Sequence, residues 1–417
     1  MTTVKTTRTR VPLWAWPIAL LIVAAAVAPL VMHWLGNPDD QRLVDLDVYR
    51  TGGEAVLAGR PVYDFVTPAP QLLPFTYPPI AALLATPLAM MSWPLAQWVW
   101  TAGVFAALAV AVGFTFRPVL ERAGRTQAVL LPLLFAFLVV MCTFLMPIRD
   151  QVRFGQVDIL LVALCLADCA ARRPWWPRGF LIGLATAVKL TPGVFLIYLL
   201  ITAFGGGDQA KVLEQRRTLY TAVITASLLT VLPLAVIPQD TWDFWFSALL
   251  DPGRVGANNA TTNQSIRGML LRLYLPDWLT SVIWVALVAA IGWYGFRYAR
   301  RAFQDGDTMT AVALTGLMAV LLSPVAWIHH LAWVVVVLGA IVGTGTDVVR
   351  VRVGLAVWLY YVVPIPWWGV SLRAAEIPVL SPVLGKIVQN AYGLGAVGLV
   401  FLLGVWVRQR HYTTITK

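Results

Sequence analysis

Residues 14–35, WAWPIALLIVAAAVAPLVMHWL, decide the fold of this chain, because the stretch contains no Asp, Glu, Lys or Arg. A helix needs about 20 predominantly apolar residues to cross a bilayer, so this stretch is long enough for one crossing. A cleaved signal peptide is the competing interpretation, since the alanines at 24–26 resemble a cleavage site. The apolar core of a signal peptide is about 7–15 residues long, which is shorter than this run. We therefore expect a retained anchor, preceded by a cytoplasmic tail at 1–12.

The same apolar character continues through the whole chain. Of its 417 residues, 59% are hydrophobic and 12% are charged, whereas soluble domains have about 45–50% apolar and about 25% charged residues. This composition excludes a disordered chain, a coiled coil and a soluble enzyme. It predicts an all-α integral membrane protein, with one transmembrane domain over residues 1–417 built as a polytopic helical bundle. The net charge of +11 does not indicate nucleic-acid binding, because the basic residues form short clusters between apolar runs.

The basic clusters give the expected orientation. After the N-terminus, Lys and Arg gather at 117–125, 172–178, 211–217, 297–301, 350–352 and 408–417. Cytoplasmic loops of membrane proteins carry an excess of Lys and Arg, so all these clusters are expected inside, including the C-terminal tail at 408–417. The apolar stretches between them must then cross an even number of times, about twelve in total. Both termini are expected in the cytoplasm.

Most of the apolar stretches divide at a polar break that would face the other side of the membrane. The breaks fall at 149–156, 238–277, 323–330 and 364–386. Residues 180–204 have no room for two full crossings, so a tight hairpin or two broken half-helices are expected there, turning at 189–192. Residues 80–91 are also too short to cross, and we expect them to be half-buried or re-entrant.

The first periplasmic loop, residues 36–78, contains a candidate catalytic carboxylate. Its residues 45–64 read DLDVYRTGGEAVLAGRPVYD and predict a short helix on the membrane surface. Asp45 stands where the first crossing gives way to this helix, and a carboxylate there can act as a general base toward a hydroxyl. The alternative is that Asp45 only caps the helix. Asp45 and Asp47 also form an Asp-x-Asp pattern like that of metal-dependent sugar transferases, which is a weak signal as a bare tripeptide.

Cationic side chains in the later outer segments are candidate phosphate ligands. Lys189 lies inside the apolar hairpin, where an ionisable side chain is costly and usually functional, although a lysine that snorkels to the interface is the alternative. Arg153 belongs to a polar cluster with Arg149, Gln156 and Asp158. Arginine can bind phosphate through two parallel hydrogen bonds; an ordinary polar loop is the alternative.

Two adjacent histidines, His329 and His330, lie at the outer turn 323–330. They could bind a metal, a phosphate or a sugar hydroxyl, or they could simply be histidines at the interface. Neighbours on an α-helix diverge by about 100°, so one ring is expected to face the cavity and the other to pack. This geometry argues against one ion held by both rings, and no metal is predicted.

The second long periplasmic loop, residues 239–279, has the composition of a sugar site. Aromatic residues at 242–245 precede a segment rich in amides and hydroxyls at 258–267. Within that segment, Asn263, Gln264 and Arg267 are the candidate sugar contacts.

Seven motifs occur in order between residues 40 and 335. They are Asp45-x-x-Val48-Tyr49, then GRPVYD at 59–64, FTYPP at 75–79, FGQVD at 154–158, KLTP at 189–192, NQS at 263–265 and SPVAWIHH at 323–330. Together they resemble the polyprenyl-phosphate-mannose-dependent α-1,2-mannosyltransferases of actinobacteria, glycosyltransferase family 87, with the integral-membrane GT-C fold. The residues after 335 match only in hydropathy.

The resemblance implies an inverting transfer of mannose on the periplasmic side of the plasma membrane, from a β-linked polyprenyl phosphate to a hydroxyl of a lipid-anchored mannoside. The family's catalytic base maps to Asp45, and its histidine at the outer turn maps to His329 or His330, with His329 favoured as the catalytic one. Lys189, Arg153 and His330 would bind the donor phosphate. Sugar or acceptor contacts are expected from Asp47, Tyr49, Tyr77, Gln156, Asn263, Gln264 and Arg267.

The implied partners are membrane lipids, the donor polyprenyl-phosphate-mannose and a mannosylated phosphatidylinositol-type acceptor, in the synthesis of phosphatidylinositol mannosides, lipomannan or lipoarabinomannan. No cofactor, no metal and no nucleic acid are expected, and the protein is expected to be a monomer. A transporter or flippase of a lipid-linked sugar is the rival interpretation. It would keep its polar site near the bilayer midplane, often at paired broken helices of a repeat, whereas this sequence shows no repeat and gathers its polar residues at the outer edge.

Overall fold

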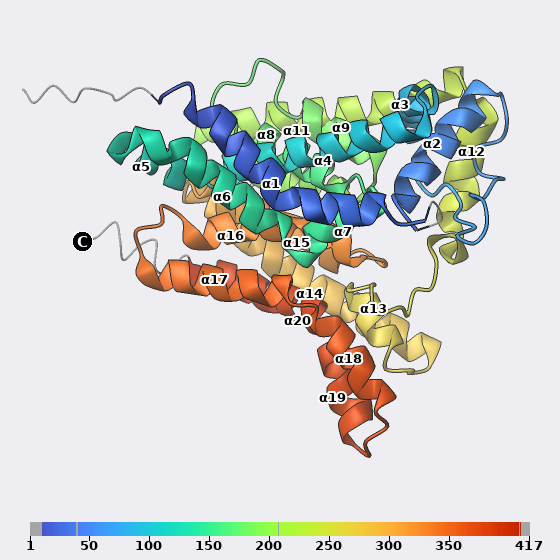
Figure 1. Cartoon of the computed structure of the whole chain (residues 1–417). Helices are drawn as coiled ribbons and strands as arrows, with labels where there is room; N and C mark the ends of the chain where they lie inside the picture. The colour runs from blue at the N-terminus through green and yellow to red at the C-terminus, as the bar shows by residue number, and fades with distance from the viewer. Residues whose placement is uncertain (1–10, 39–40, 207, 408, 410–417) are drawn as a thin grey trace, which may run out of the picture.

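The computed structural model describes residues 11–38, 41–206, 208–407 and 409, and this part of the chain is helical (Figure 1). Its β-type pairings are two isolated bridges, Val66 with Pro74 and Asn263 with Trp327. The predicted all-α class is therefore confirmed. The tails 1–12 and 408–417, expected in the cytoplasm, lie almost wholly outside the described residues.

Four helices of the described chain are long and apolar enough to cross a membrane, judged by length and composition. They are α1 (Ala15–Leu35), α4 (Trp93–Thr115), α11 (Gln209–Val231), which continues into η3 (Leu232–Ala235), and α14 (Asp277–Gln304). The helix α1 continues without a break through the alanines at 24–26.

Three bent pairs of helices raise the number of candidate spans to seven if each pair counts as one. They are η1 (Ala128–Leu130) and α6 (Leu131–Thr143) with α7 (Met146–Phe154), bent by 79°; α17 (Val348–Val362) with α18 (Ile365–Ala374), bent by 47°; and α19 (Leu380–Gln389) with α20 (Ala391–Phe401) and η7 (Leu402–Val407), bent by 57°. The expected twelve crossings are not confirmed, because the other apolar stretches form helices too short to span a bilayer by themselves.

These shorter helices fall into two groups. The apolar ones are α3 (Pro79–Ala89), α8 (Asp158–Ala170), α9 (Phe180–Val188), α10 (Val194–Ala203), α15 (Thr308–Leu321) and α16 (Val334–Val342). The others are α2 (Val44–Leu57), α5 (Arg117–Thr126), η2 (Thr191–Gly193), α12 (Pro238–Phe246), η4 (Ala248–Leu250), η5 (Pro252–Val255), α13 (Ile266–Leu271) and η6 (Ile328–Trp333). As expected for residues 80–91, α3 is a short helix, and it packs against α2.

The stretch 180–204 forms the predicted hairpin, which turns at Lys189 and η2 between α9 and α10. Both of its open ends return to the same part of α11. The Arg178 guanidinium, just before α9, lies 2.8 Å from the Glu214 carboxylate, and the Arg216 guanidinium donates to the carbonyl at the end of α10 at 2.9 Å. Nine or ten helical residues rise about 14 Å, about half of a bilayer core. The hairpin tip with Lys189 therefore ends inside the molecule.

The helices α15 and α16 form the centre of the bundle. Residues 310–321 of α15 and 334–341 of α16 are all buried, as expected for helices that are apolar on every side. The polar break between them contains η6 and the two histidines. Figure 1 shows α2, α3 and α12 together at one end of the bundle and α5 at the opposite end. The α18–α19 hairpin projects from the side of the bundle.

Candidate active site

The start of α2 brings Asp45 to the centre of a polar cluster. The helix begins after Leu43, whose backbone is left-handed with φ of 49° and whose N–H donates to the Arg153 carbonyl at 3.1 Å. Because Leu43 is the N-cap and makes no side-chain capping bond, the capping alternative for Asp45 is wrong. The Asp45 carboxylate instead accepts a hydrogen bond from the side chain of Gln156.

A glycine allows this contact between α7 and α2. Gly155 ends α7 with φ of 72°, a conformation that side chains rarely adopt. A Cβ at this position would lie 2.8 Å from the Cβ of Leu46 in α2. The close approach places Gln156, the next residue, against Asp45.

Two tyrosine hydroxyls complete the group around Asp45. Tyr49, one turn further along α2, and Tyr77 both donate to Oε1 of Gln156 at 3.3 Å, and their own hydroxyls lie 2.9 Å apart. With Oε1 occupied as an acceptor, the Gln156 amide group is oriented to donate to Asp45. Both tyrosines are buried.

The loop between α2 and α3 holds Tyr77 in place and explains two of the sequence motifs. The Tyr63 hydroxyl donates to the Tyr77 carbonyl at 2.8 Å. The preceding amide of Val62 donates to the Asp240 carboxylate of α12 at 2.6 Å, and Arg254 donates to the Tyr63 carbonyl at 2.8 Å. The buried pair Val62 and Tyr63 of the first motif and the mostly buried motif at 75–79 thus form one framework that positions Tyr77.

Lys189 links this group to a second carboxylate. Its ammonium lies 2.7 Å from Oδ1 of Asp158, the first residue of α8, and 3.1 Å from Nε2 of His330. It also lies 5.4 Å from the centre of the Tyr77 ring. Tyr77 therefore stands between the Asp45 group and the Asp158 group, and the two form one site.

Both histidines face Asp158. The Nε2 atoms of His329 and His330 lie 3.8 and 3.9 Å from Oδ2 of Asp158. The expectation that one ring would pack away from the cavity is wrong, because the rings stack edge to face at 4.7 Å and both turn toward the same carboxylate. Gln151 holds the turn, since its amide donates to the His329 carbonyl at 2.8 Å.

The same three residues are the group best arranged to hold a metal in the described chain. The ligand atoms of Asp158, His329 and His330 lie within 4.8 Å of one another, and Oδ2 of Asp158 and Nε2 of His329 have no hydrogen-bond partner among the described residues. The Lys189 ammonium, however, already contacts Asp158 and His330. A fixed positive charge at this position would repel a divalent cation, so the residues fit a metal poorly. The absence of a metal stays a prediction.

Among the described residues, no cation makes a hydrogen bond to the Asp45 carboxylate, and this affects the pKa of Asp45. Burial raises the pKa of Asp45 from 3.8 to about 7, against the lowering effects of the Gln156 hydrogen bond and the Lys189 charge. A general base works best when its pKa lies near the operating pH. Asp45 therefore has the acidity of a general base at neutral pH.

Three predicted site residues lie outside the cluster. Asp47 is two positions beyond Asp45 and so faces another side of α2; burial raises its pKa, and its nearest cation is Arg50. The two carboxylates of the Asp-x-Asp pattern therefore do not converge.

The other two residues outside the cluster are arginines that lie over aromatic rings. Arg153 is exposed and lies over the Phe154 ring at 4.9 Å, and Arg267 lies over the Trp284 ring at 5.5 Å.

Asn263 and Gln264 are completely buried and bind backbone groups. Oδ1 of Asn263 accepts from the Ala326 amide at 3.0 Å, three residues before His329. The Gln264 amide donates to the Gln389 carbonyl at 3.0 Å, and its Oε1 accepts from the Gly393 amide at 2.8 Å. These bonds tie the loop 239–279 to the histidine turn and to α19 and α20. Their predicted contact with sugar stays a prediction.

Sequence reasoning gave no separate role to Asp158 and did not single out Gln151. A signal for Asp158 was present, because a lysine within an apolar hairpin needs a counterion and the nearby polar motif FGQVD offers one. Gln151 lies in the helix α7, and nothing in the sequence marks its contact with a turn nearly two hundred residues later.

Comparisons with known proteins agree with the order of the motifs. Residues 75–324 match the profile described as glycosyltransferase family 87. A polyprenol-phosphate-mannose-dependent alpha-(1-2)-phosphatidylinositol mannoside mannosyltransferase of Mycolicibacterium smegmatis is 35% identical over 355 residues, 78% of this chain and 75% of that protein. A protein of the same name from Mycobacterium tuberculosis is 30% identical over 413 residues, 95% of this chain and 92% of that protein. No solved structure gives a significant match.

Proposed function

This chain belongs to glycosyltransferase family 87, whose mannosyltransferases it resembles over most of its length, and we propose that it transfers mannose from polyprenyl-phosphate-mannose to a phosphatidylinositol mannoside. The donor and the acceptor are those named for the mycobacterial relatives. We propose an α-1,2 linkage formed with inversion from a β-linked donor. The observation that carries this proposal is one buried site in which Tyr77 lies between the Asp45 carboxylate with its Gln156 partner and the ammonium of Lys189, which is held by Asp158 and His330.

The reaction needs a base for the acceptor hydroxyl. Asp45 takes the proton of that hydroxyl while its oxygen attacks the anomeric carbon of mannose. The bond from this carbon to the phosphate oxygen breaks, and the phosphate leaves with the electron pair. One base is enough for a single inversion, unlike the paired carboxylates of hydrolytic glycosidases.

The departing polyprenyl phosphate needs positive charge and hydrogen-bond donors. The Lys189 ammonium is held by Asp158 and lies beside both histidines. His329 has a buried Nε2 with no partner among the described residues, so it can donate to a phosphate oxygen when that nitrogen carries a proton. Fixed donors in a dry site stabilise developing charge without reorganisation.

The remaining predicted residues are given supporting roles. Tyr49, Tyr77 and Gln156 lie next to Asp45 and contact the acceptor or the transferred sugar. Asp47, Arg153 and Arg267, outside the cluster, contact substrate parts that extend beyond it, with Arg153 directed to phosphate. Asn263 and Gln264 position the histidine turn.

The proposal includes the setting of the reaction. The protein acts in the plasma membrane as a monomer without metal, with the site on the periplasmic side and both termini in the cytoplasm. Its product enters phosphatidylinositol mannosides, lipomannan or lipoarabinomannan. Asp45 lies in the first turn of α2, and Figure 1 shows α2 at the end of the bundle opposite the basic helix α5, which supports this orientation.

The direct test is Asp45→Asn in purified protein given polyprenyl-phosphate-mannose and a phosphatidylinositol mannoside. We expect a loss of transfer of about 10²–10⁴-fold, the usual contribution of a general base. Glu54→Gln is the matched control, because it removes a carboxylate of the same helix that pairs with Arg50 outside the cluster. Normal transfer by the Asp45 variant, or an equal loss in the control, would remove Asp45 from the mechanism.

A further inference from the structure

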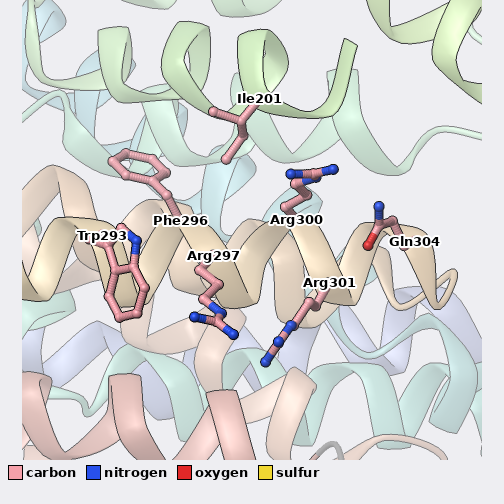
Figure 2. Close-up of a pocket in the computed structure, with 7 residues that line it drawn as sticks. All are labelled: Ile201, Trp293, Phe296, Arg297, Arg300, Arg301 and Gln304. Carbon is pink, nitrogen blue, oxygen red and sulfur yellow. The ribbon is translucent and has the colours of Figure 1, made fainter. Parts of the chain in front are cut away.

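A cavity of about 470 Å³ lies between α10 and α14, far from the candidate active site. It is lined by Ile201 of α10 and by two aromatic residues, three arginines and Gln304 of α14 (Figure 2). The 28 residues of α14 rise about 42 Å, and the cavity lies along its C-terminal part, residues 293–304. Figure 1 shows that this helix starts next to α13 and ends toward the side of α5.

The arginines of this cavity share one face of the helix. Arg297, Arg300 and Arg301 are three and four positions apart, a spacing that places side chains next to one another. The ion pairs found within the described chain do not include any of them. Three adjacent positive charges repel one another, so an anion bound at this face would stabilise it.

Aromatic rings hold two of the three arginine heads, although Arg297 is exposed to solvent. Arg297 lies over the Trp293 ring at 5.0 Å and Arg301 over the Tyr298 ring at 5.1 Å, contacts that hold a guanidinium while leaving its N–H edge available. Nε of Arg300 is buried and has no hydrogen-bond partner among the described residues. A buried donor without a partner is costly, and a phosphate oxygen would satisfy it.

The rest of the cavity wall is apolar and continues to the outer surface of a membrane helix. Trp293 is 62% exposed, and Ile201 and Phe296 are partly exposed. Tryptophan at this position is typical of the boundary between headgroups and acyl chains. The ligand must therefore combine a negative head with an apolar body, which excludes free inorganic phosphate as its best partner.

We propose that this pocket, defined by Ile201, Trp293, Arg297, Arg300 and Arg301, binds one anionic glycerophospholipid of the cytoplasmic leaflet. The arginines bind the phosphodiester, and the first carbons of the acyl chains lie against Trp293 and Ile201. Basic pockets between membrane helices bind anionic headgroups, and the volume is that of a small-molecule site. The pocket shares no lining residue with the mannosyl-transfer site, and only the choice of leaflet rests on the orientation given with the proposed function.

Native mass spectrometry of the whole purified protein tests the proposal, with phosphatidylglycerol and phosphatidylcholine as probes. We expect the wild type to retain one phosphatidylglycerol in preference to phosphatidylcholine. The triple variant Arg297→Gln, Arg300→Gln, Arg301→Gln should weaken this binding at least about tenfold, because three phosphate donors are lost. The matched control, Arg125→Gln, Lys211→Gln, Arg217→Gln, removes three exposed charges of the other basic clusters and should bind as the wild type does.

A second variant keeps every charge and changes only the volume of the cavity. Ile201→Trp fills the cavity, and it should lose the bound lipid while the arginines remain. This variant carries the test if the triple variant does not fold. Retention of phosphatidylglycerol by the pocket variants, an equal loss in the control variant, or equal retention of phosphatidylcholine by the wild type would each overturn the proposal.

Discussion

The two carboxylates of the site, Asp45 and Asp158, have the same side chain and opposite surroundings. Asp45 is contacted by the neutral amide of Gln156, and burial raises its pKa to about 7. Asp158 lies 2.7 Å from the Lys189 ammonium and faces both histidines. The first surroundings favour gain and loss of a proton, and the second favour a permanent charge. This difference supports the proposed roles, with Asp45 as the base and Asp158 as the residue that positions a cation.

The largest expected difference between Asp45 and Asp158 is in the stability of their asparagine variants. Asp158→Asn leaves the buried Lys189 ammonium without its counterion, and removing one partner of a buried ion pair costs about 3–5 kcal/mol. Asp45→Asn should not lower the stability, because the carboxylate it removes is desolvated and has no cation in hydrogen-bond contact. Thermal unfolding of the two detergent-purified variants measures both changes in stability.

The double variant Asp158→Asn, Lys189→Met makes this prediction specific to the pair. Removing both charges should cost less than removing Asp158 alone, since no buried charge is left without a partner. If the two single losses simply add in the double variant, Asp158 does not serve as the counterion of Lys189.

The next effect is the pH dependence of transfer. Asp45 acts as a base only when ionised, and its pKa is about 7. The initial rate at low substrate concentration should rise about tenfold per pH unit below this value and level off above it, so that pH 5 and pH 8 differ by about 100-fold. A rate that is flat over this range would separate Asp45 from the proton transfer.

The raised pKa of Asp45 also makes the stability of the folded protein depend on pH in a definite direction. The pKa of Asp45 is higher in the folded protein than its ordinary value of 3.8, so the folded state binds the proton more tightly than the unfolded state does. Its stabilising contribution is complete below about pH 3.8 and is lost as the pH rises through about 7. Asp45→Asn should remove this part of the pH dependence of unfolding.

Much of the contrast between Asp45 and Asp158 could be predicted from the sequence. What could not be predicted has physical causes. The position of Asp45 at the end of the first apolar run and the turn at Lys189 followed from local hydropathy, and the structure has both. The number of crossings did not follow, because hydropathy does not separate a half-length hairpin from two spans. The need of Lys189 for a counterion could be read from the sequence, but the contact between Gln151 of α7 and the His329 carbonyl could not, because a single sequence does not show which distant segments meet.

The third prediction concerns the histidine that faces Asp158 without a hydrogen bond. His329→Leu keeps a similar volume and removes the unpartnered Nε2. A hydrogen bond to a charged group contributes about 1.5–3 kcal/mol, so the KM for the donor should rise about tenfold or more while the KM for the acceptor changes little. Equal changes in both constants would show that His329 does not select the donor phosphate.

The smallest expected effect concerns the amide that keeps Asp45 usable as a base. Gln156→Leu removes the hydrogen bond that lowers the pKa of this carboxylate, and a bond to a charged group contributes about 1.5–3 kcal/mol. The midpoint of the pH–rate profile should therefore move upward by about one to two units, and the rate above the midpoint should change less. Tyr49→Phe is the matched control, because its hydroxyl contacts Gln156 and Tyr77 and it should leave the midpoint nearly in place. A midpoint that stays fixed in Gln156→Leu would mean that burial alone sets the acidity of Asp45.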